Sequence, residues 1–332
     1  MAEYSYRSTD ESLLTPALYT FFVNPLVKIL PYWLPANFIT LGSFLFIIAA
    51  FLISLRGYYT HTYDYWWAIP LLALCYVVGD CADGKQARKT NTGSPLGEYL
   101  DHFLDSFVTG LLMGILLMSF HVTNAFVILS GFFCLYIGQI ATFWERYKSR
   151  TMYFGLLSTS EGTLAIAFTS WLMAFKPIRT LGEQPFVLGI CYKEIPILAC
   201  MFLCALTAVQ AFMRTRYLSL RLILHLVLVC AFIIFLSYFH YTDMLYITLV
   251  VTLYQALFLA SLLSATALNT AVGMPEPVVP LSCVLFFIAP QYAQEIKIGQ
   301  MMYLLIRIAI RFTRFFRLHT RYWHWINPPI AQ

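Results

Sequence analysis

Long runs of apolar residues recur along nearly the whole chain and are separated by short polar connections. Each run has about 20 residues, enough to cross the roughly 30 Å hydrocarbon core of a bilayer as a helix. The strands of a membrane β-barrel would alternate apolar and polar residues, whereas these runs are apolar on all sides. The pattern predicts an all-α, polytopic membrane protein with about ten transmembrane helices, at 37–55, 66–82, 99–120, 123–144, 162–175, 194–212, 218–239, 245–268, 277–293 and 298–316.

The segment before the first span has a different pattern. Residues 15–30 mix aromatic and aliphatic side chains with Asn24 and Lys28, and two prolines follow at Pro31 and Pro35. We expect an amphipathic helix that lies in the membrane interface, with a buried half-span as the alternative. The chain then divides into a cytosolic N-terminus with this helix (1–36), one membrane domain (37–318) and a cytosolic tail (319–332).

Composition supports the membrane assignment and excludes other classes. Hydrophobic residues make up 60% of the 332 residues and charged residues 11%, where a soluble domain has roughly 25% charged residues. The eight cysteines lie mostly in apolar runs and form no CxxC pair, so neither a zinc site nor a disulfide framework is expected. The net charge of +5 is small and its cations flank the spans, so we expect no nucleic-acid partner.

The basic residues also predict orientation. When the connections are assigned alternately to two sides of the membrane, most lysines and arginines fall on one side, which the positive-inside rule makes cytoplasmic. That side contains both termini and the connection after the second span. Its basic residues are Lys28, Lys85, Arg88, Lys89, Arg146, Lys148, Arg150, Arg214, Arg216, Arg221, Arg311, Arg314, Arg317 and Arg321.

Four aspartates lie where the second and third spans meet. Asp80 and Asp83 are three residues apart, about 60° around one helix, and Asp101 and Asp105 are four residues apart, about 40° around the next. Each intramembrane carboxylate costs about 2.5–3.5 kcal/mol on insertion scales, so four together need a compensating partner. Mg²⁺ or Mn²⁺ is the expected partner, and facing carboxylates can bridge two ions. The alternative is that the aspartates cap helices and pair with nearby cations, although Asp80 and Asp83 near a helix C-terminus would oppose its dipole.

Residues between these aspartates suit an anion. Gly84 and Gly97 allow backbone to approach a ligand or another helix closely, although turn formation or packing also explains them. Arg88 offers a planar fork that matches phosphate oxygens, unless it only follows the positive-inside rule. Metals and an arginine together favour a pyrophosphate-sized anion over a transported ion.

The segment resembles, position for position, the signature of the CDP-alcohol phosphotransferase family. The match is Asp80, two residues, Asp83-Gly84, two residues, Ala87-Arg88, eight residues, Gly97, three residues, Asp101, three residues and Asp105. Its remaining residues, with Lys85-Gln86, Ser94-Pro95 and His102, look like the choline/ethanolamine phosphotransferase branch. The ten-span plan is similar as well.

Two positions depart from that branch. Phe103-Leu104 stands where the branch usually has a small Gly-Cys pair, which could reshape the lipid-acceptor side. The usual Pro-Asn at the first span is here Pro35-Ala36-Asn37. A nucleotide-side role for Asn37 therefore competes with a helix N-cap role.

The resemblance implies a reaction and a set of roles. Phosphocholine or phosphoethanolamine would pass from CDP-choline or CDP-ethanolamine to diacylglycerol, with CMP as the leaving group. Asp80, Asp83, Asp101 and Asp105 would bind two Mg²⁺ or Mn²⁺ ions, and Gly84 and Arg88 would bind the diphosphate. An imidazole that is largely neutral at physiological pH can accept the lipid hydroxyl proton, so His102 is the candidate base, with Asp105 as its orienting partner or as the base itself.

Glu161 is a candidate contact for the cationic choline or ethanolamine head. Trp144, Tyr147 and Tyr153 could add cation–π contacts. The alternative is that these are residues of the interfacial belt and, for Glu161, a carboxylate at a helix N-terminus.

Other functions stay open at this point. The same fold could use ceramide or another lipid acceptor, or another CDP-alcohol, and a divalent-cation transporter could line its path with the same carboxylates. Family resemblance further suggests a homodimer in the endoplasmic reticulum or Golgi membrane, with the active site facing the cytosol.

Overall fold

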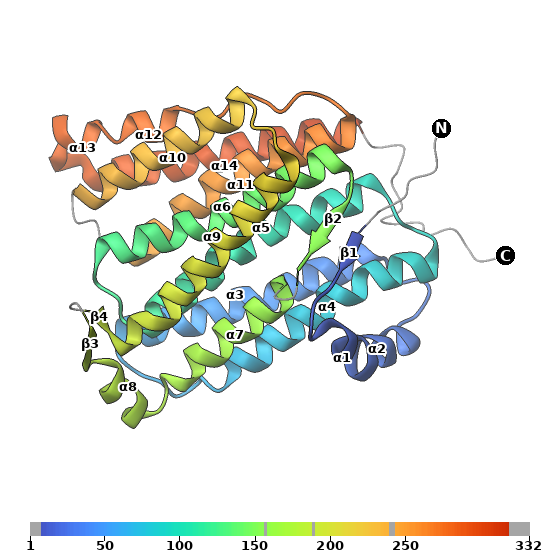
Figure 1. Ribbon diagram of the computed structural model, residues 1–332, viewed down its shortest axis with the longest axis horizontal. Coiled ribbons are helices and arrows are strands. Elements are labelled where there is room, and N and C mark those ends of the chain that lie inside the picture. Colours follow the sequence, from blue (N-terminus) through green and yellow to red (C-terminus); the bar gives the residue numbers. More distant parts are fainter. Residues whose placement is uncertain (1–7, 156–157, 188–189, 239–242, 319–332) are drawn as a thin grey trace.

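The computed structural model describes residues 8–155, 158–187, 190–238 and 243–318. Helices dominate this part of the chain, and two short sheets join β1 (Ser8–Asp10) to β2 (Met152–Phe154) and β3 (Pro185–Val187) to β4 (Ile190–Cys191) (Figure 1). The α-helices are α1 (Thr15–Leu18), α2 (Asn24–Ile29), α3 (Ala36–Thr60), α4 (Ala68–Thr90), α5 (Pro95–Ser119), α6 (Ala125–Ser149), α7 (Thr159–Leu172), α8 (Lys176–Gly182), α9 (Ile195–Thr215), α10 (Leu220–Tyr238), α11 (Met244–Leu268), α12 (Val278–Ser282), α13 (Leu285–Ile288) and α14 (Ala293–Leu318).

The all-α membrane fold is confirmed, but the count of ten spans is not. By length and composition, six of the described helices can cross a membrane. They are α3, α5, α6, α10 and α11, together with α9 extended back to Tyr192. Helix α4 carries the charged motif residues, and α7 has only 14 residues.

The predicted span at 277–293 is wrong as a single helix. It consists of α12 and α13, followed by a 3₁₀ turn at Pro290–Tyr292. The proline ring at Pro290 lacks an N–H and clashes with the preceding turn, so a helix cannot run through it unbroken. Helix α14 is continuous, but it contains several arginines, among them Arg307, Arg311 and Arg314.

Two helices, α5 and α11, form the centre of the bundle and are the most buried of the candidate spans. They approach closely at Gly110 and Gly114 of α5. A Cβ on Gly110 would collide with Thr252, and one on Gly114 would lie 2.8 Å from the Thr248 methyl group. Small residues four positions apart let membrane helices pack backbone to backbone. This contact fixes α5, and therefore its aspartates, to the core.

The N-terminal helix is present as predicted, although a π-helical turn at Tyr19–Val23 joins α1 to α2. Its apolar face packs on α4, where Val23, Val27 and Ala82 form a small buried cluster. Its position in the membrane interface remains a prediction.

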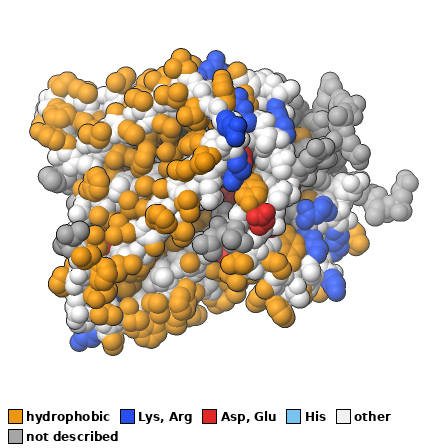
Figure 2. Space-filling model, viewed as in Figure 1, with side chains coloured by type: hydrophobic (Ala, Val, Ile, Leu, Met, Phe, Trp, Pro, Cys, Tyr) orange, Lys and Arg blue, Asp and Glu red, His pale blue; other side chains and the backbone are white. Residues whose placement is uncertain are grey.

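Apolar side chains cover most of the face shown in Figure 2, as expected of a surface that contacts lipid. Most of the lysine and arginine side chains visible there lie toward the half of the molecule that contains α1, α2 and the α4–α5 connection. This separation of charge agrees with the predicted asymmetry. The side that faces the cytosol stays a prediction, and the tail at 319–332 lies outside the described residues.

Candidate active site

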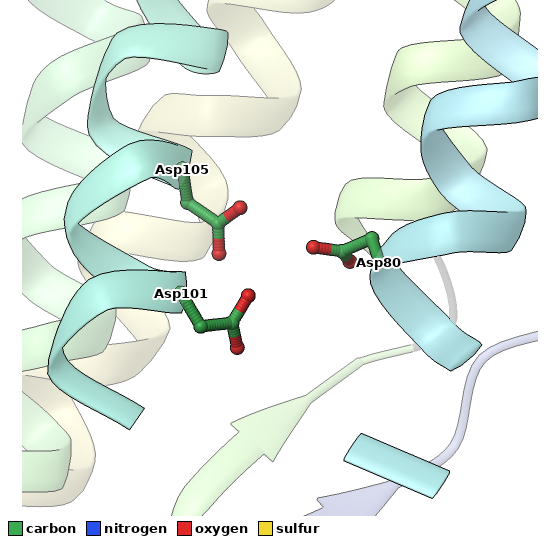
Figure 3. A group of neighbouring side chains, drawn as sticks. All are labelled: Asp80, Asp101 and Asp105. Atoms are coloured by element: carbon green, nitrogen blue, oxygen red, sulfur yellow. The ribbon is translucent and has the colours of Figure 1, made fainter. Parts of the chain in front are cut away.

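The end of α4 and the start of α5 carry the four aspartates. Asn91 ends α4 in the left-handed conformation, with φ of 54°. Ser94 then caps α5 by accepting a hydrogen bond from the Gly97 N–H at 3.1 Å, and Pro95 occupies the first turn. Both helices pack on α3. Figure 3 shows the Asp80 carboxylate of α4 facing the carboxylates of Asp101 and Asp105 of α5.

Three of the four aspartates meet. Asp80 from α4 and Asp101 and Asp105 from α5 each offer a carboxylate oxygen, and these oxygens lie within 4.8 Å of one another. All three side chains are half-buried. Like charges at this separation repel strongly where water is partly excluded. Three hard oxygen donors around one point fit a divalent cation such as Mg²⁺ or Mn²⁺, so the predicted metal role of these three is supported by their geometry.

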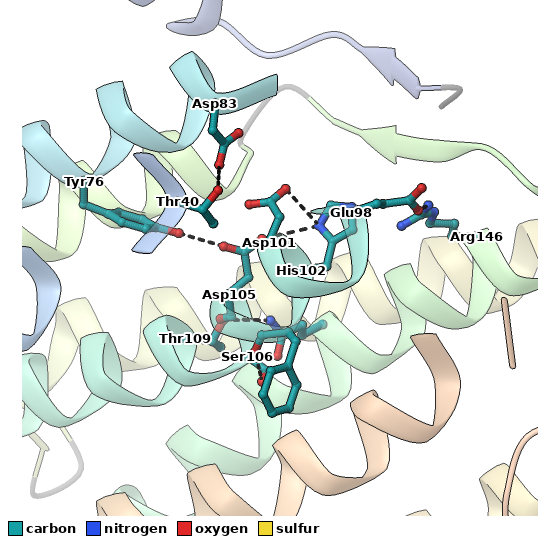
Figure 4. Close-up of polar contacts among 12 residues, drawn as sticks. Thr40, Tyr76, Asp83, Glu98, Asp101, His102, Asp105, Ser106, Thr109 and Arg146 are labelled. Atoms are coloured by element: carbon teal, nitrogen blue, oxygen red, sulfur yellow. Dashed lines mark hydrogen bonds and ion pairs between the residues drawn. The ribbon is translucent and has the colours of Figure 1, made fainter. Parts of the chain in front are cut away.

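Asp83 is not one of these three. Its Oδ2 accepts a hydrogen bond from the Thr40 hydroxyl of α3 at 2.5 Å, and only 5% of the residue is exposed. Figure 4 shows the Asp83 side chain directed at Thr40. Gly79 allows this approach of α4 to α3, because a Cβ there would lie 2.6 Å from the Ser43 Cβ. Asp83 is thus tied to α3, and its role as a metal ligand remains a prediction.

His102 and Tyr76 flank the three carboxylates. The His102 Nδ1 atom lies 3.5 Å from the Asp105 Oδ2 and 3.8 Å from the Asp101 Oδ2. The imidazole is buried, with its ring 5.3 Å from that of Phe143 in an edge-to-face arrangement. Tyr76 donates its hydroxyl proton to the Asp105 Oδ1 at 2.8 Å. Asp105 is therefore held from two sides, as a residue that orients His102 would be.

Thr40 and Tyr76 were missed by sequence reasoning. Tyr76 lies one helical turn before Asp80, so its position on the aspartate face of α4 was a usable signal. Thr40 lies on α3, and its contact with Asp83 depends on the packing of two helices. The sequence offers no comparable signal for that contact.

Gly84 and Arg88 continue the face of α4 that carries Asp80, since the three residues are spaced four apart. The surface beside Gly84 is open: if a Cβ were added there, its nearest neighbour would be an Arg88 guanidinium nitrogen, at 3.8 Å. Arg88 is itself exposed. An anion could therefore reach both residues, although their substrate-binding role remains a prediction.

Asn37 lies in the first turn of α3, where its Oδ1 would be 3.1 Å from a Cβ added to Gly97. The helix begins at Ala36 with Pro35 as its N-cap residue and no side-chain cap bond, so the N-cap alternative for Asn37 is wrong. Glu161 caps α7 by accepting bonds from Ser158, and it also accepts the Leu14 N–H at 2.7 Å. These contacts match the N-terminal carboxylate alternative for Glu161. Substrate contacts of either residue stay untested predictions.

The aromatic residues suggested for the cationic head already face protein cations. Lys148 lies 5.1 Å from the centre of the Trp144 ring and 5.3 Å from that of Tyr147. The Arg214 guanidinium lies 4.4 Å from the Tyr153 ring. Their contact with choline therefore remains a prediction, and it would require displacement of these cations or use of the other ring face.

The departure at Phe103 has a structural setting. Its ring packs against Tyr99, Phe107 and Phe312, so it forms part of the contact between α5 and α14. In the same stretch of α5, Glu98 forms an ion pair with Arg146 of α6. The sequence had assigned Arg146 only to a basic flank.

The model of the CDP-alcohol phosphatidyltransferase family matches residues 33–213, which include the whole aspartate site. Because the match covers more than half of the chain, the chain belongs to this family. The resemblance inferred from the motif is confirmed.

Among individual proteins, the chain is similar to cholinephosphotransferase 1 of Gallus gallus, with 32% identity over 232 residues, 64% of each chain. It is 40% identical to choline/ethanolaminephosphotransferase 2 of Arabidopsis thaliana over 109 residues, 31% of this chain and 27% of that protein. Ethanolaminephosphotransferase 1 of Homo sapiens is 27% identical over 212 residues, 58% of this chain and 52% of that protein. The matches span less than two thirds of the length of these relatives.

Proposed function

We propose that this chain transfers phosphocholine or phosphoethanolamine from CDP-choline or CDP-ethanolamine to diacylglycerol and releases CMP. The products would be phosphatidylcholine or phosphatidylethanolamine. The observation that carries the proposal is the meeting of Asp80, Asp101 and Asp105 within the region matched by the family. The similar proteins named above are choline and ethanolamine phosphotransferases, which supports these donors.

Asp80, Asp101 and Asp105 would hold Mg²⁺ or Mn²⁺, with Asp83 as a candidate ligand of a second ion. Such ions would neutralise charge on the diphosphate as the phosphorus–oxygen bond to CMP breaks. Arg88 would bind diphosphate oxygens from the exposed end of the same α4 face, with room left by Gly84.

His102 would take the proton of the lipid hydroxyl as that oxygen attacks phosphorus. Asp105 lies beside the imidazole and would favour its protonated form after the transfer. Tyr76 would keep the Asp105 carboxylate turned toward His102 through its 2.8 Å hydrogen bond. The reaction asks for positioning more than for covalent work by the protein.

The location also fits the substrates. A site between α4 and the first turns of the apolar helix α5 would be accessible to a water-soluble CDP-alcohol and to a lipid in the bilayer. We propose that it faces the cytosol in the endoplasmic reticulum or Golgi membrane and that the protein forms a homodimer, as the family resemblance suggests.

The test is a radiolabel assay with purified protein in lipid nanodiscs. CDP-choline and CDP-ethanolamine are each combined with diacylglycerol, an ether-linked analogue or ceramide, with Mg²⁺, Mn²⁺ or EDTA. We expect cation-dependent CMP release and a labelled phospholipid from diacylglycerol. Asp101→Asn should abolish turnover, whereas Asp64→Asn, at an exposed aspartate in the α3–α4 connection, should not.

Two other results would replace the proposal. Product formation from ceramide alone would identify another lipid acceptor on the same fold. Cation flux into liposomes without CMP release from any donor would favour the transporter hypothesis.

A further inference from the structure

The last turns of α4 hold the N-terminal helix by hydrogen bonds. Lys89 donates to the backbone carbonyls of Val27 at 2.7 Å and Leu30 at 2.6 Å. Lys85 donates to the Asn24 side chain. These two lysines, which the sequence places in a basic flank, bind α2 from its first residue to its C-cap residue.

Gln86 fixes the connection that follows this helix. Its side-chain amide donates to the Pro31 carbonyl at 2.9 Å and to the Leu34 carbonyl at 3.1 Å. Gln86 is fully buried. The segment from Asn24 to Leu34 is therefore attached to the same turns of α4 that carry Gly84 and Arg88.

The π-helical turn at Tyr19–Val23 also packs on α4. The turn begins at Tyr19 and closes with the Asn24 N–H donating to the Tyr19 carbonyl. Pro25 lacks an N–H, so a normal α-helical bond from that position is impossible, which favours the wider turn. Single π-helical turns within helices are frequent at functional sites.

The Tyr19 side chain contacts α4 between Asp80 and Arg88. Its hydroxyl makes a long contact of 3.5 Å with the Cys81 carbonyl, and the Lys85 ammonium lies 5.6 Å from its ring centre. The Arg88 side chain interacts with the hydroxyl, and the charge of Asp80 also acts on it. Burial raises the pKa of Tyr19 above its ordinary value.

The spacing of this face suits a diphosphate. Asp80, Gly84 and Arg88 are successive residues of one stripe, each about 6 Å along the helix from the last. A diphosphate lying over Gly84 would reach the carboxylate site at one end and the guanidinium at the other. Arg88 is exposed, and a long side chain in water loses conformational freedom when it binds.

We propose that Tyr19 is a positioning residue for the nucleotide diphosphate: its hydroxyl holds the Arg88 guanidinium over Gly84, on the side of Asp80. This inference rests on the proposed function and adds the N-terminal helix to the donor site. It gives a purpose to the hydrogen bonds from Lys85, Gln86 and Lys89 of α4 to the segment from Asn24 to Leu34. These bonds hold the N-terminal helix, and with it Tyr19, against α4.

The test uses Tyr19→Phe, which removes the hydroxyl and keeps the ring, with Tyr32→Phe as the matched control. Tyr32 is on the same segment, but its ring faces Lys89 at 4.7 Å and is exposed. Binding of radiolabelled CDP with Mg²⁺ is measured in nanodiscs, and KM and kcat are measured with CDP-aminoalcohol and diacylglycerol. We expect Tyr19→Phe to weaken CDP binding and to raise the donor KM by about 3- to 10-fold. The kcat, the acceptor KM and the melting temperature should be nearly unchanged.

A double-mutant cycle separates positioning from general packing. In an Arg88→Gln background, Tyr19→Phe should have little further effect on CDP binding. Unchanged binding in the single variant would overturn the proposal, as would an equal loss in both backgrounds. If wild type binds CDP but transfers neither aminoalcohol, the proposed reaction fails while the role of Tyr19 is still decided by the binding cycle.

Discussion

Buried polar groups are arranged differently in two regions of the molecule. In the region formed by α10, α11 and α14, two contacts pair complementary polar groups. The His225 Nε2 lies 3.0 Å from the Gln255 Oε1, and the Lys297 ammonium donates to Asp243 at 2.8 Å. Each contact joins two helices, so these pairs stabilise the bundle.

Between α4 and α5, groups of the same charge face one another. Asp80, Asp101 and Asp105 turn their carboxylates toward one another. This arrangement opposes folding unless a cation or a proton compensates it. Burial alone therefore does not distinguish a structural polar contact from a candidate site. The distinction lies in whether the buried group faces a complementary group or one of the same charge. Substitutions in the two regions should therefore have opposite effects on activity and stability.

The largest expected effect is that of Asp80→Asn. Loss of a carboxylate from the cation site should lower turnover by about 10³-fold, comparable to removal of a strong electrostatic contact in other enzymes. Without divalent cations the melting temperature should be unchanged or higher, because one repelling charge is gone. CMP release and thermal unfolding, each with and without Mg²⁺, measure both quantities.

The matched change in the other region is Asp243→Asn, which breaks the contact with Lys297. It should lower the melting temperature and leave the kinetics alone. Equal losses of stability in the two variants, with activity retained in Asp80→Asn, would contradict the distinction between the regions.

His102→Ala is expected to have the next largest effect. A positioned general base contributes typically 10²- to 10⁴-fold, so kcat should fall by at least about 100-fold. Steady-state kinetics of CMP release measure this loss. The control is His225→Asn, which should lower stability and keep the wild-type kcat.

A near-normal kcat in His102→Ala would transfer the base role to Asp105 or to water.

Substitutions at Asp83 and Thr40 should have a smaller effect. They decide whether Asp83 binds metal or mainly joins α4 to α3. Thr40→Val removes a hydrogen bond to a carboxylate, worth about 1.5–3 kcal/mol, so a decrease in activity of about tenfold is expected. If Asp83 binds metal, Asp83→Asn should resemble Asp80→Asn. If Asp83 mainly joins α4 to α3, it should resemble Thr40→Val. Steady-state kinetics of the three variants at several Mg²⁺ concentrations make this comparison, with Thr142→Val on α6 as a threonine control.

The sequence predicted the parts of this site that depend on local geometry. Helical periodicity and a short connection were enough to bring Asp80 close to Asp101 and Asp105. The chemistry of the donors then indicated a hard cation. The same reasoning located the long apolar helices, since span length follows from bilayer thickness.

What the sequence did not predict depends on contacts between distant segments. Asp83 accepts a hydrogen bond from Thr40, which α3 brings to it, and Glu161 meets the Leu14 N–H across 147 positions of sequence. The apolar run at 277–293 was counted as one span, although its helix ends before Pro290. Hydropathy reports the length of a segment, but it does not report which side chains from other helices will meet it.

The smallest expected effect on activity is that of Gln255→Leu, which tests the region of complementary contacts. Gln255 and His225 are both buried, so the change leaves the His225 Nε2 without its partner and should lower stability by about 1–3 kcal/mol. Turnover at a temperature where the variant is folded should equal that of wild type. The double variant His225→Leu with Gln255→Leu should recover part of the stability, because a buried polar pair replaced by apolar side chains leaves neither group unsatisfied. Thermal unfolding in nanodiscs and CMP release measure the two properties separately. If Gln255→Leu abolishes turnover while its unfolding is unchanged, this pair takes part in the reaction, and complementary pairing cannot be used to identify purely structural contacts in this bundle.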